Sequence, residues 1–333
     1  MKFVRLLGAV LALAALAATS AQADPVSLEI AYLPFVGFSQ LFIIDREGWA
    51  RQAGIELKLT RFASGPAIVQ ALASGKFDAA YVGIGPVMVA RAGGVDLKIV
   101  AANGQELVPL VGRGALAELF AQGKTPADSF AAYHAAAGRP AKIATLPKGS
   151  VPDTVLHIYL KAQNVAPSDV DILGVGEDQV QQLMLSKAVD AAVVPEPIPT
   201  VVLSRDSSAR ILASGHEVMP GQPSGVLAVR QSAIEGKRAA IQALVTLHKR
   251  ATELMLDDPK RVLPYVSAFI GQGLVDDDTL LRALLASNRG AVRDPASIIG
   301  ATMQLQQAQV ESGAQSRLVP TDELFDLSFA KAP

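Results

Sequence analysis

The sequence contains no cysteine, and aromatic residues make up only 5% of its 333 residues, with Trp49 as the single tryptophan. The lack of cysteine excludes disulfides, thiol chemistry and lipid attachment at an N-terminal cysteine. Acidic and basic residues nearly balance, at 31 and 30, so the chain lacks the basic surface that a nucleic acid partner requires. After residue 18, no apolar run reaches the length of a membrane span without a charge or a proline. These absences leave an ordinary globular chain.

The first 23 residues have the pattern of an export signal. Lys2 and Arg5 give a positive start, residues 6–18 are almost purely apolar, and Ala21-Gln22-Ala23 supplies the small residues that a signal peptidase recognises. The apolar run is too short to span a bilayer comfortably. We therefore expect residues 1–23 to be a removed signal peptide and the mature chain, from Asp24, to lie in the periplasm. Loss of the two cations changes the formal net charge from -1 to -3.

Catalytic and metal-binding motifs are also lacking. The four histidines, His134, His157, His216 and His248, are widely separated and have no metal-ligand spacing. Two Gly-x-Gly pairs, at 83–85 and 174–176, begin a dinucleotide fingerprint, but the third glycine is missing from both. No phosphate-binding loop, nucleophile elbow or zinc-protease motif occurs. We therefore predict no metal, no cofactor and no enzymatic activity.

What is present is an alternation of strand and helix patterns. Strands are predicted over 26–32, 55–62 and 78–82, and helices over 39–53 and 64–74. The second helix begins with a capping serine and a proline and ends before a glycine. Strand–helix–strand units in this order predict a parallel sheet.

The same alternation returns in the second half of the chain. Residues 142–144 and 170–175 read as strands, 153–163 as a helix, and Glu177 as the start of another helix. In addition, residues 72–80 align with 184–192: in both, a helix ends near a serine and an Asp-Ala-Ala strand follows. The chain is therefore predicted to form two α/β lobes of similar build.

The loops that follow the strands are the predicted ligand site. Ligands of such sheets bind beyond the carboxyl ends of the strands, where the first N–H groups of helices are unpaired and carry partial positive charge. Four loops qualify, at 34–38, 64–67, 83–86 and 148–153. This arrangement suits an oxyanion such as a sulfonate, carboxylate or nitrate. Serine and glycine are also ordinary helix caps, so any single loop has a purely structural alternative.

Together, a series of short motifs resembles the periplasmic binding proteins of nitrate, sulfonate, taurine and thiamine-precursor ABC transporters. They are Glu47-Gly48-Trp49, Ala53-Gly54-Ile55-Glu56-Leu57, Ser64-Gly65-Pro66-Ala67, Ala73-Ser74-Gly75-Lys76-Phe77-Asp78, Val82-Gly83 with Pro86, Ala92-Gly93-Gly94-Val95-Asp96-Leu97-Lys98, Lys148-Gly149-Ser150 and Val189-Asp190-Ala191-Ala192 leading to Glu196-Pro197. The resemblance covers nearly the whole mature chain. It identifies the family but no particular ligand.

The resemblance implies a type II periplasmic-binding-protein fold, in which two α/β lobes joined by a two-segment hinge close over a solute. We expect lobe 1 at 24–110 plus 220–333, lobe 2 at 111–219, and crossings near 108–114 and 220–226. It also implies delivery of a small molecule to an ABC permease in the inner membrane. We expect the protein to be a monomer.

One departure from the family bears on the ligand. Many relatives have an aromatic residue before the Glu-Pro pair, where this chain has Pro195, so stacking of a pyrimidine ring is less favoured than a small aliphatic oxyanion. Tyr32, Phe35, Phe38 and Tyr81 are the candidate aromatics of the cleft, whereas Trp49 is assigned to a core. Glu196 would bind the amine of a taurine-like zwitterion, or alternatively cap a helix.

Lys148 is the candidate cation for an anionic head group. The predicted ligand-binding residues are Pro34, Phe35, Phe38, Ser64, Gly65, Gly83, Pro86, Asn103, Lys148, Gly149, Ser150 and Glu196. The alternatives are a binder of a thiamine-precursor heterocycle, an exported enzyme on the same fold, and a ligand-binding sensor.

Overall fold

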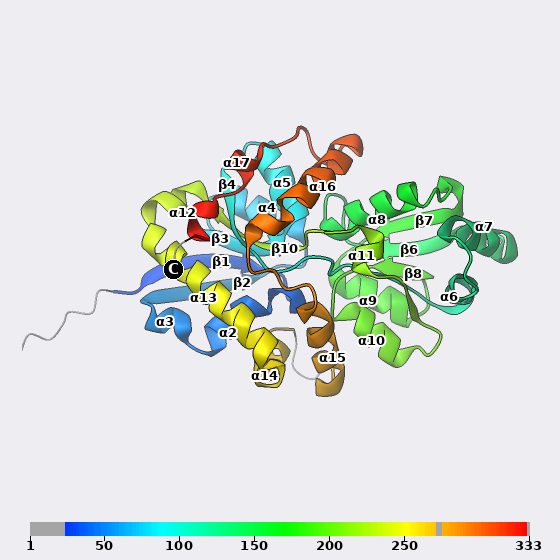
Figure 1. The fold of residues 1–333 in the computed structure, drawn as a ribbon, viewed down its shortest axis with the longest axis horizontal. Helices are drawn as coiled ribbons and strands as arrows, with labels where there is room; N and C mark the ends of the chain where they lie inside the picture. Colours follow the sequence, from blue (N-terminus) through cyan, green and yellow to red (C-terminus); the bar gives the residue numbers. More distant parts are fainter. Residues whose placement is uncertain (1–23, 271–274, 332–333) are drawn as a thin grey trace, which may run out of the picture.

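The computed structural model describes residues 24–270 and 275–331, so the predicted signal peptide lies outside the described residues. In this part of the chain two five-stranded sheets form the centres of two lobes (Figure 1). The first sheet has the order β2 (Ile55–Arg61), β1 (Val26–Tyr32), β3 (Ala79–Gly83), β10 (Gly225–Arg230) and β4 (Leu97–Ala102). The second has the order β7 (Val170–Gly174), β6 (Ala141–Thr145), β8 (Ala191–Val193), β5 (Leu110–Gly112) and β9 (Arg210–Ala213).

The two sheets have the same topology. In each, the first three strands are parallel and the fourth is antiparallel to both of its neighbours. The predicted strand–helix–strand units are therefore parallel as expected, and each sheet also contains one antiparallel strand, β10 or β5, that the sequence pattern did not predict. Each of these strands follows a crossing between the lobes, so it enters its sheet from the cleft side. It therefore runs antiparallel to both neighbouring strands. The predicted similarity of the two lobes is confirmed.

The sequence match between residues 72–80 and 184–192 is explained by hydrogen bonds that its aspartate makes to the neighbouring strand. The Asp78 carboxylate accepts a hydrogen bond from the Glu29 N–H at 2.9 Å, and the Asp78 N–H donates to the Glu29 carbonyl at 2.9 Å. Asp190 makes the same pair of bonds with Lys142, at 2.8 and 2.9 Å. Both aspartates therefore fix the start of the third strand of a sheet against the second, which explains why the two segments share a sequence.

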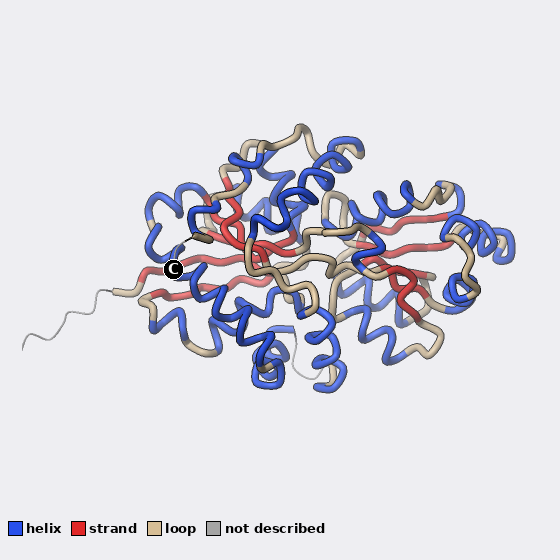
Figure 2. The backbone as a smooth tube through the Cα atoms, viewed as in Figure 1, coloured by secondary structure: helices blue, strands red, loops and turns tan. Residues whose placement is uncertain are grey.

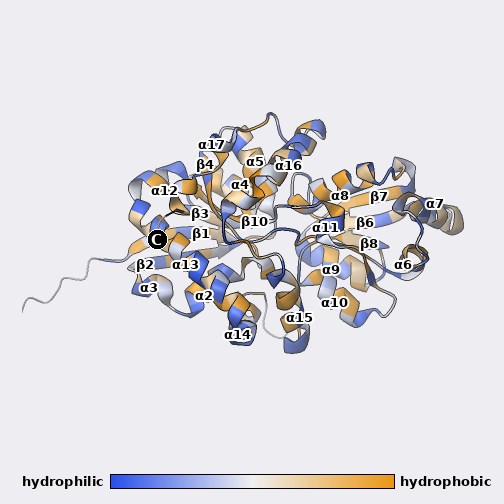
Figure 3. Ribbon diagram, in the orientation of Figure 1, coloured by the Kyte–Doolittle hydropathy of each residue, from blue (hydrophilic) through white to orange (hydrophobic). Residues whose placement is uncertain are grey.

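Helices cover both faces of each sheet. In the first lobe, α2 (Ser39–Arg46), α3 (Trp49–Gln52) and α13 (Arg238–Asp257) lie on one side, and α4 (Gly65–Ala73) and α5 (Ile84–Ala92) on the other (Figure 1). In the second lobe, α8 (Val151–Ala162) lies opposite α9 (Glu177–Leu185) and α10 (Ile198–Arg205). The remaining helices are α6 (Gly114–Ala121), α7 (Pro126–Ala137), α11 (Gly215–Val218), α12 (Gln231–Gly236), α14 (Pro259–Ile270), α15 (Asp277–Asn288), α16 (Ile299–Glu311) and α17 (Thr321–Leu324). Many helices carry hydrophobic and hydrophilic residues on opposite faces, as expected where one face covers a sheet (Figure 3).

Two predicted helices have different bounds in the structure. The helix expected over 39–53 is divided, because Gly48 adopts a left-handed φ of 69° between α2 and α3. The helix expected from Asp153 begins at Val151, since Ser150 is its N-cap and Pro152 fits the first turn. Trp49 is buried, and the Arg250 guanidinium lies 3.7 Å from its ring centre, so its assignment to a core is confirmed.

Two loops carry the chain between the lobes (Figure 2). The first lies between the end of β4 at Ala102 and the start of β5 at Leu110, and the second between α11 and the start of β10 at Gly225. The first crossing therefore comes earlier than the expected 108–114, because residues 110–112 already pair with β8 and β9. The C-terminal helices join the lobes further, since α15 contacts α10 and α16 contacts α8.

Candidate ligand-binding site

The starts of three helices meet between the lobes. A Cβ atom placed on Gly85, in the first turn of α5, would lie 2.7 Å from the Gly149 carbonyl oxygen and 3.1 Å from the Val151 nitrogen, where α8 begins. A Cβ atom on Gly65, at the start of α4, would lie 2.5 Å from Pro86 Cγ. Glycine therefore permits a close approach that a larger residue would prevent. The partial positive ends of α4, α5 and α8 converge on one place.

A cavity lies at this junction and is lined by both lobes and both crossing loops. Its lining residues are Leu33, Phe35, Gly37, Phe38, Gly65, Gly83, Pro86, Leu107, Val108, Leu146, Ser150, Val151, Pro152, Pro195, Ser224 and Gly225. The space open to the centres of water molecules is about 50 Å³. Because one water needs roughly 10–15 Å³ by this measure, the cavity suits a ligand of only a few non-hydrogen atoms.

The only polar side chains among these described lining residues are two serines, and none is charged. The Ser150 hydroxyl oxygen accepts from the Asp153 N–H at 3.3 Å, and the Ser224 oxygen accepts from the Leu107 N–H at 3.3 Å. Each hydroxyl therefore keeps its O–H available as a donor. Two hydroxyl donors and converging helix starts can bind an anionic oxygen, whereas nothing in the lining provides a negative partner for an amine.

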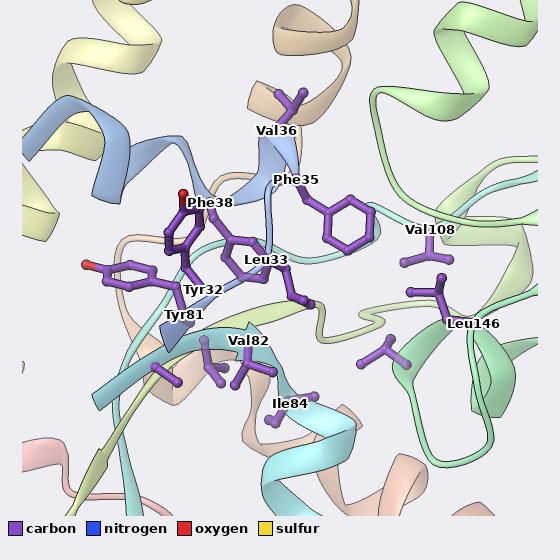
Figure 4. Packing of buried hydrophobic residues seen from close by; sticks show 14 of the residues in the cluster. Tyr32, Leu33, Phe35, Val36, Phe38, Tyr81, Val82, Ile84, Val108 and Leu146 are labelled. Carbon is purple, nitrogen blue, oxygen red and sulfur yellow. The ribbon is translucent and has the colours of Figure 1, made fainter. Parts of the chain in front are cut away.

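Apolar side chains form the rest of the cavity lining, which we call the apolar wall. Phe35 projects toward Val108 and Leu146, and Leu33 and Phe38 lie beside it (Figure 4). The Phe35 and Phe38 rings are tilted, with their centres 6.3 Å apart, so they do not form parallel plates for a heterocycle. This wall suits a short aliphatic group.

The predicted site residues divide into two groups in the structure. Those that line the cavity are Phe35, Phe38, Gly65, Gly83, Pro86 and Ser150. Those that do not are Pro34, Ser64, Asn103, Lys148, Gly149 and Glu196. Lys148 is exposed, and Ser64 caps α4 through the Ala67 N–H at 3.4 Å. Asn103 is buried and donates to the Gln40 side chain at 2.8 Å.

Two of the four candidate aromatics lie behind the cavity instead of lining it. Tyr32 packs edge-on against Phe42 and Phe269. Tyr81 is fully buried under Phe38, and its hydroxyl lies 3.3 Å from His248 Nδ1. Both tyrosines therefore support the wall from the core of the first lobe.

The Glu196 carboxylate points toward its own helix. It accepts hydrogen bonds from the Thr200 N–H at 3.1 Å and the Thr200 hydroxyl at 2.9 Å, beside the first turn of α10. The helix-capping alternative therefore describes the observed contacts. Burial raises the pKa of Glu196 to about 7, although the two bonds from Thr200 act in the opposite direction.

The raised pKa of Glu196 predicts a specific pH dependence of stability. The folded state keeps this proton up to about pH 7, whereas the unfolded chain releases it near its ordinary pKa of 4.5. The stabilisation that comes from the protonated Glu196 carboxyl is therefore fully present below pH 4.5. It is lost as the pH rises toward 7, which lowers the free energy of unfolding by roughly 3 kcal/mol at most. We expect Glu196→Gln to gain stability over the wild type across this range, measured by urea unfolding at pH 4.5, 6 and 8. If the free energy of unfolding changes with pH in the same way in both proteins, the pKa of Glu196 is not raised in the folded state.

Several contacts hold the lobes together around the cavity. The Val36 N–H donates to the Glu196 carbonyl at 3.3 Å, close to the hinge. On α16, the Gln309 amide donates to the Gly149 carbonyl at 2.9 Å and to the Thr154 hydroxyl at 3.2 Å. At the end of that helix, Glu311 pairs with Lys161 at 3.0 Å. The loop that begins α8 is thus held by a C-terminal helix of the first lobe.

The sequence interpretation missed most of the apolar wall and the role of α16. Leu33, Leu146 and Val108 are ordinary hydrophobic residues at strand ends, and nothing distinguishes them from core residues in the sequence. Ser224 had a usable signal, because it lies next to Gly225 in a predicted crossing. Gln309 lies about 160 residues from Gly149, and no local pattern indicates that they meet.

No group of three or more His, Cys, Asp or Glu side chains in residues 24–270 and 275–331 could hold a metal ion. In the same residues, no helix is both long and apolar enough to cross a membrane.

The two equivalent sheets, the two crossing loops and a cavity between the lobes define the fold of the periplasmic binding proteins. The chain belongs to the NMT1-like family, whose profile matches residues 21–263. A protein of Brucella abortus strain 2308, named only as a candidate binding protein, is 23% identical over 257 residues, which are 75% of this chain and 73% of the relative.

Solved structures with this fold include two proteins with named ligands. The alkanesulfonate-binding protein SsuA from Xanthomonas axonopodis pv. citri, bound to MOPS, has a TM-score of 0.72 at 18% identity, covering 91% of this chain and 99% of that one. The periplasmic nitrate-binding protein NrtA from Synechocystis PCC 6803 has a TM-score of 0.64 at 15% identity, covering 91% and 92%. At this level of identity the likeness shows the fold.

Proposed function

We propose that this protein is the periplasmic solute-binding component of an ABC importer, and that it binds a small oxyanion with a short aliphatic group, of the alkanesulfonate type. The observation that carries the proposal is the cavity in which the starts of α4, α5 and α8 meet beside two hydroxyl donors and an apolar wall. Helix starts favour anions, and the wall favours a hydrocarbon group. The fold shared with alkanesulfonate- and nitrate-binding proteins supports delivery to a permease.

The lining favours an alkanesulfonate over nitrate, a taurine-like amine and a pyrimidine. Nitrate has no apolar part that would use Phe35, Val108 and Leu146. A taurine-like amine would need a carboxylate, and Glu196 is bonded to Thr200 outside the cavity lining. A pyrimidine would need parallel aromatic faces, which Phe35 and Phe38 do not provide.

We expect the ligand to raise the thermal stability of the mature chain by mass action. At a hundredfold excess over the dissociation constant, the gain is about 2.7 kcal/mol, which corresponds to several degrees in Tm. A thermal-shift screen of methane-, ethane- and butanesulfonate, nitrate, taurine, acetate and a thiamine-precursor pyrimidine measures this. A shift with the pyrimidine alone would overturn the proposed ligand class.

The same screen separates binding from catalysis when each compound is also recovered after incubation. A binding protein returns the compound unchanged and in stoichiometric complex with the chain. Turnover of any of them would support the alternative of an exported enzyme on this fold.

A further inference from the structure

Leu107 lies between the ligand cavity and a second, larger crevice. It lines the cavity of about 50 Å³, and it also lines a crevice of about 390 Å³ on the hinge side. The crevice is bounded by the first crossing loop, β9, α11 and the end of α15, through Pro109, Ile211 and Ala286 among others. A single side chain therefore borders both spaces.

The backbone packs closely around the Leu107 side chain. A Cβ atom on Gly104 would lie 2.5 Å from Leu107 Cδ1, and one on Gly290 would lie 2.7 Å from Leu107 Cδ2. A Cβ atom on Gly37 would lie 3.4 Å from Cδ1. Gly104 and Gly290, from two separate segments, thus leave room for this leucine side chain, which packs against both of them.

The main chain at Leu107 is held independently of its side chain. The Leu107 N–H donates to the Ser224 hydroxyl oxygen, and the flanking Glu106 and Val108 N–H groups both donate to Gln222, at 2.7 and 2.9 Å. Shortening the leucine side chain therefore leaves the bonds between the two crossing loops intact.

The crevice beyond Leu107 offers both apolar and polar surface. Pro109, Ile211 and Ala286 offer apolar surface, whereas Glu196, Arg289 and the Glu106–His216 pair, at 2.8 Å, add ionisable groups. The apolar residues could contact methylene groups of a ligand that the cavity is too small to enclose.

From this arrangement we propose that Leu107 is the specificity-determining residue that limits the length of the ligand's aliphatic chain. This inference rests on the proposed function. Leu107 closes the cavity at its border with the hinge crevice, so that short alkanesulfonates are enclosed and longer ones are excluded. Without the leucine side chain, the two spaces join, and a longer chain extends into the crevice.

The test compares a series of linear alkanesulfonates, from methane- to octanesulfonate, by calorimetric titration of the wild type and of Leu107→Ala. The wild type is expected to lose affinity beyond a short chain length. Leu107→Ala should bind the longer members at least tenfold more tightly than the wild type, since each buried methylene contributes about fourfold. An unchanged length profile in a folded variant overturns the inference.

Val108→Ala is the matched control. Val108 lines the cavity but does not line the crevice, so its truncation enlarges the first space without joining the two. We expect it to shift the preferred length by no more than one or two methylenes. An equal gain for long chains in both variants would show that volume alone, and not the partition by Leu107, sets the limit.

A ligand-independent measurement distinguishes failure of this inference from failure of the proposed function. Crystals of Leu107→Ala under xenon pressure should contain xenon in the space left by the leucine, between the cavity and the crevice. If no alkanesulfonate binds either protein but xenon occupies this space, the proposed ligand class is wrong and the partition stands. If the space has collapsed, the partition is wrong.

Discussion

Replacing Gly85 with alanine is expected to force the lobes apart and to lower ligand affinity about 10- to 100-fold. The added Cβ atom would lie 2.7 Å from the Gly149 carbonyl oxygen, which is main chain and cannot rotate away. Overpacking of this kind costs about 1–3 kcal/mol. The cost falls on the contact between the lobes, because alanine is a better helix former than glycine within α5.

Small-angle scattering of the mature chain and calorimetric titration with the best ligand from the screen measure this effect. We expect a larger radius of gyration for Gly85→Ala together with the weaker binding. Gly300→Ala is the matched control: Gly300 lies in α16, and a Cβ atom there meets nothing within 4 Å. Gly300→Ala should bind as the wild type does. Wild-type affinity and dimensions in Gly85→Ala would mean that α5 and α8 do not meet around the ligand.

Replacing Gln309 with leucine is expected to weaken binding about tenfold or more, although Gln309 does not line the cavity. Its amide N–H groups bond the Gly149 carbonyl and the Thr154 hydroxyl of the opposite lobe, and Gln309 is fully buried. Leucine would leave the Gly149 carbonyl without this donor, at a cost of about 1–3 kcal/mol. The loop that positions Ser150 would then lose its attachment to α16.

Gln304→Leu is the control from the same helix, because the Gln304 side chain is exposed on α16. We expect Gln304→Leu to retain wild-type affinity. The readout for Gln309→Leu should include the dissociation rate, which rises if the contact holds the lobes together after the ligand has entered. Equal dissociation rates for the two variants would assign Gln309 a purely structural role.

Local chemistry determined much of what could be predicted. Ser64 and Ser150 each precede a proline near a helix start, and both cap helices in the structure because the hydroxyl satisfies a free N–H group. The repeated Asp-Ala-Ala segment predicted two similar lobes, and the two aspartates make equivalent bonds to neighbouring strands. Such features depend on residues close in sequence or on one repeated contact.

The site was predicted only in part, for a physical reason. Gly83, Pro86 and Ser150 were found because helix starts have recognisable residues. Leu107 and Leu146 were missed, since an apolar side chain that lines a ligand cavity has the same sequence signature as one in a core. Lys148 and Glu196 were chosen for their charge, but the structure leaves Lys148 exposed and bonds Glu196 to Thr200.

The sequence by itself determined the alternation of strands and helices, the two-lobed build, the helix starts that favour an anion and the absence of thiol chemistry. Only the tertiary structure decided which surfaces of the two lobes face each other. In this packing the first crossing begins after Ala102, Gln309 contacts Gly149, and Leu107 borders both the cavity and the crevice. These contacts join residues far apart in the chain, and long-range packing, unlike a helix cap, leaves no local pattern in the sequence.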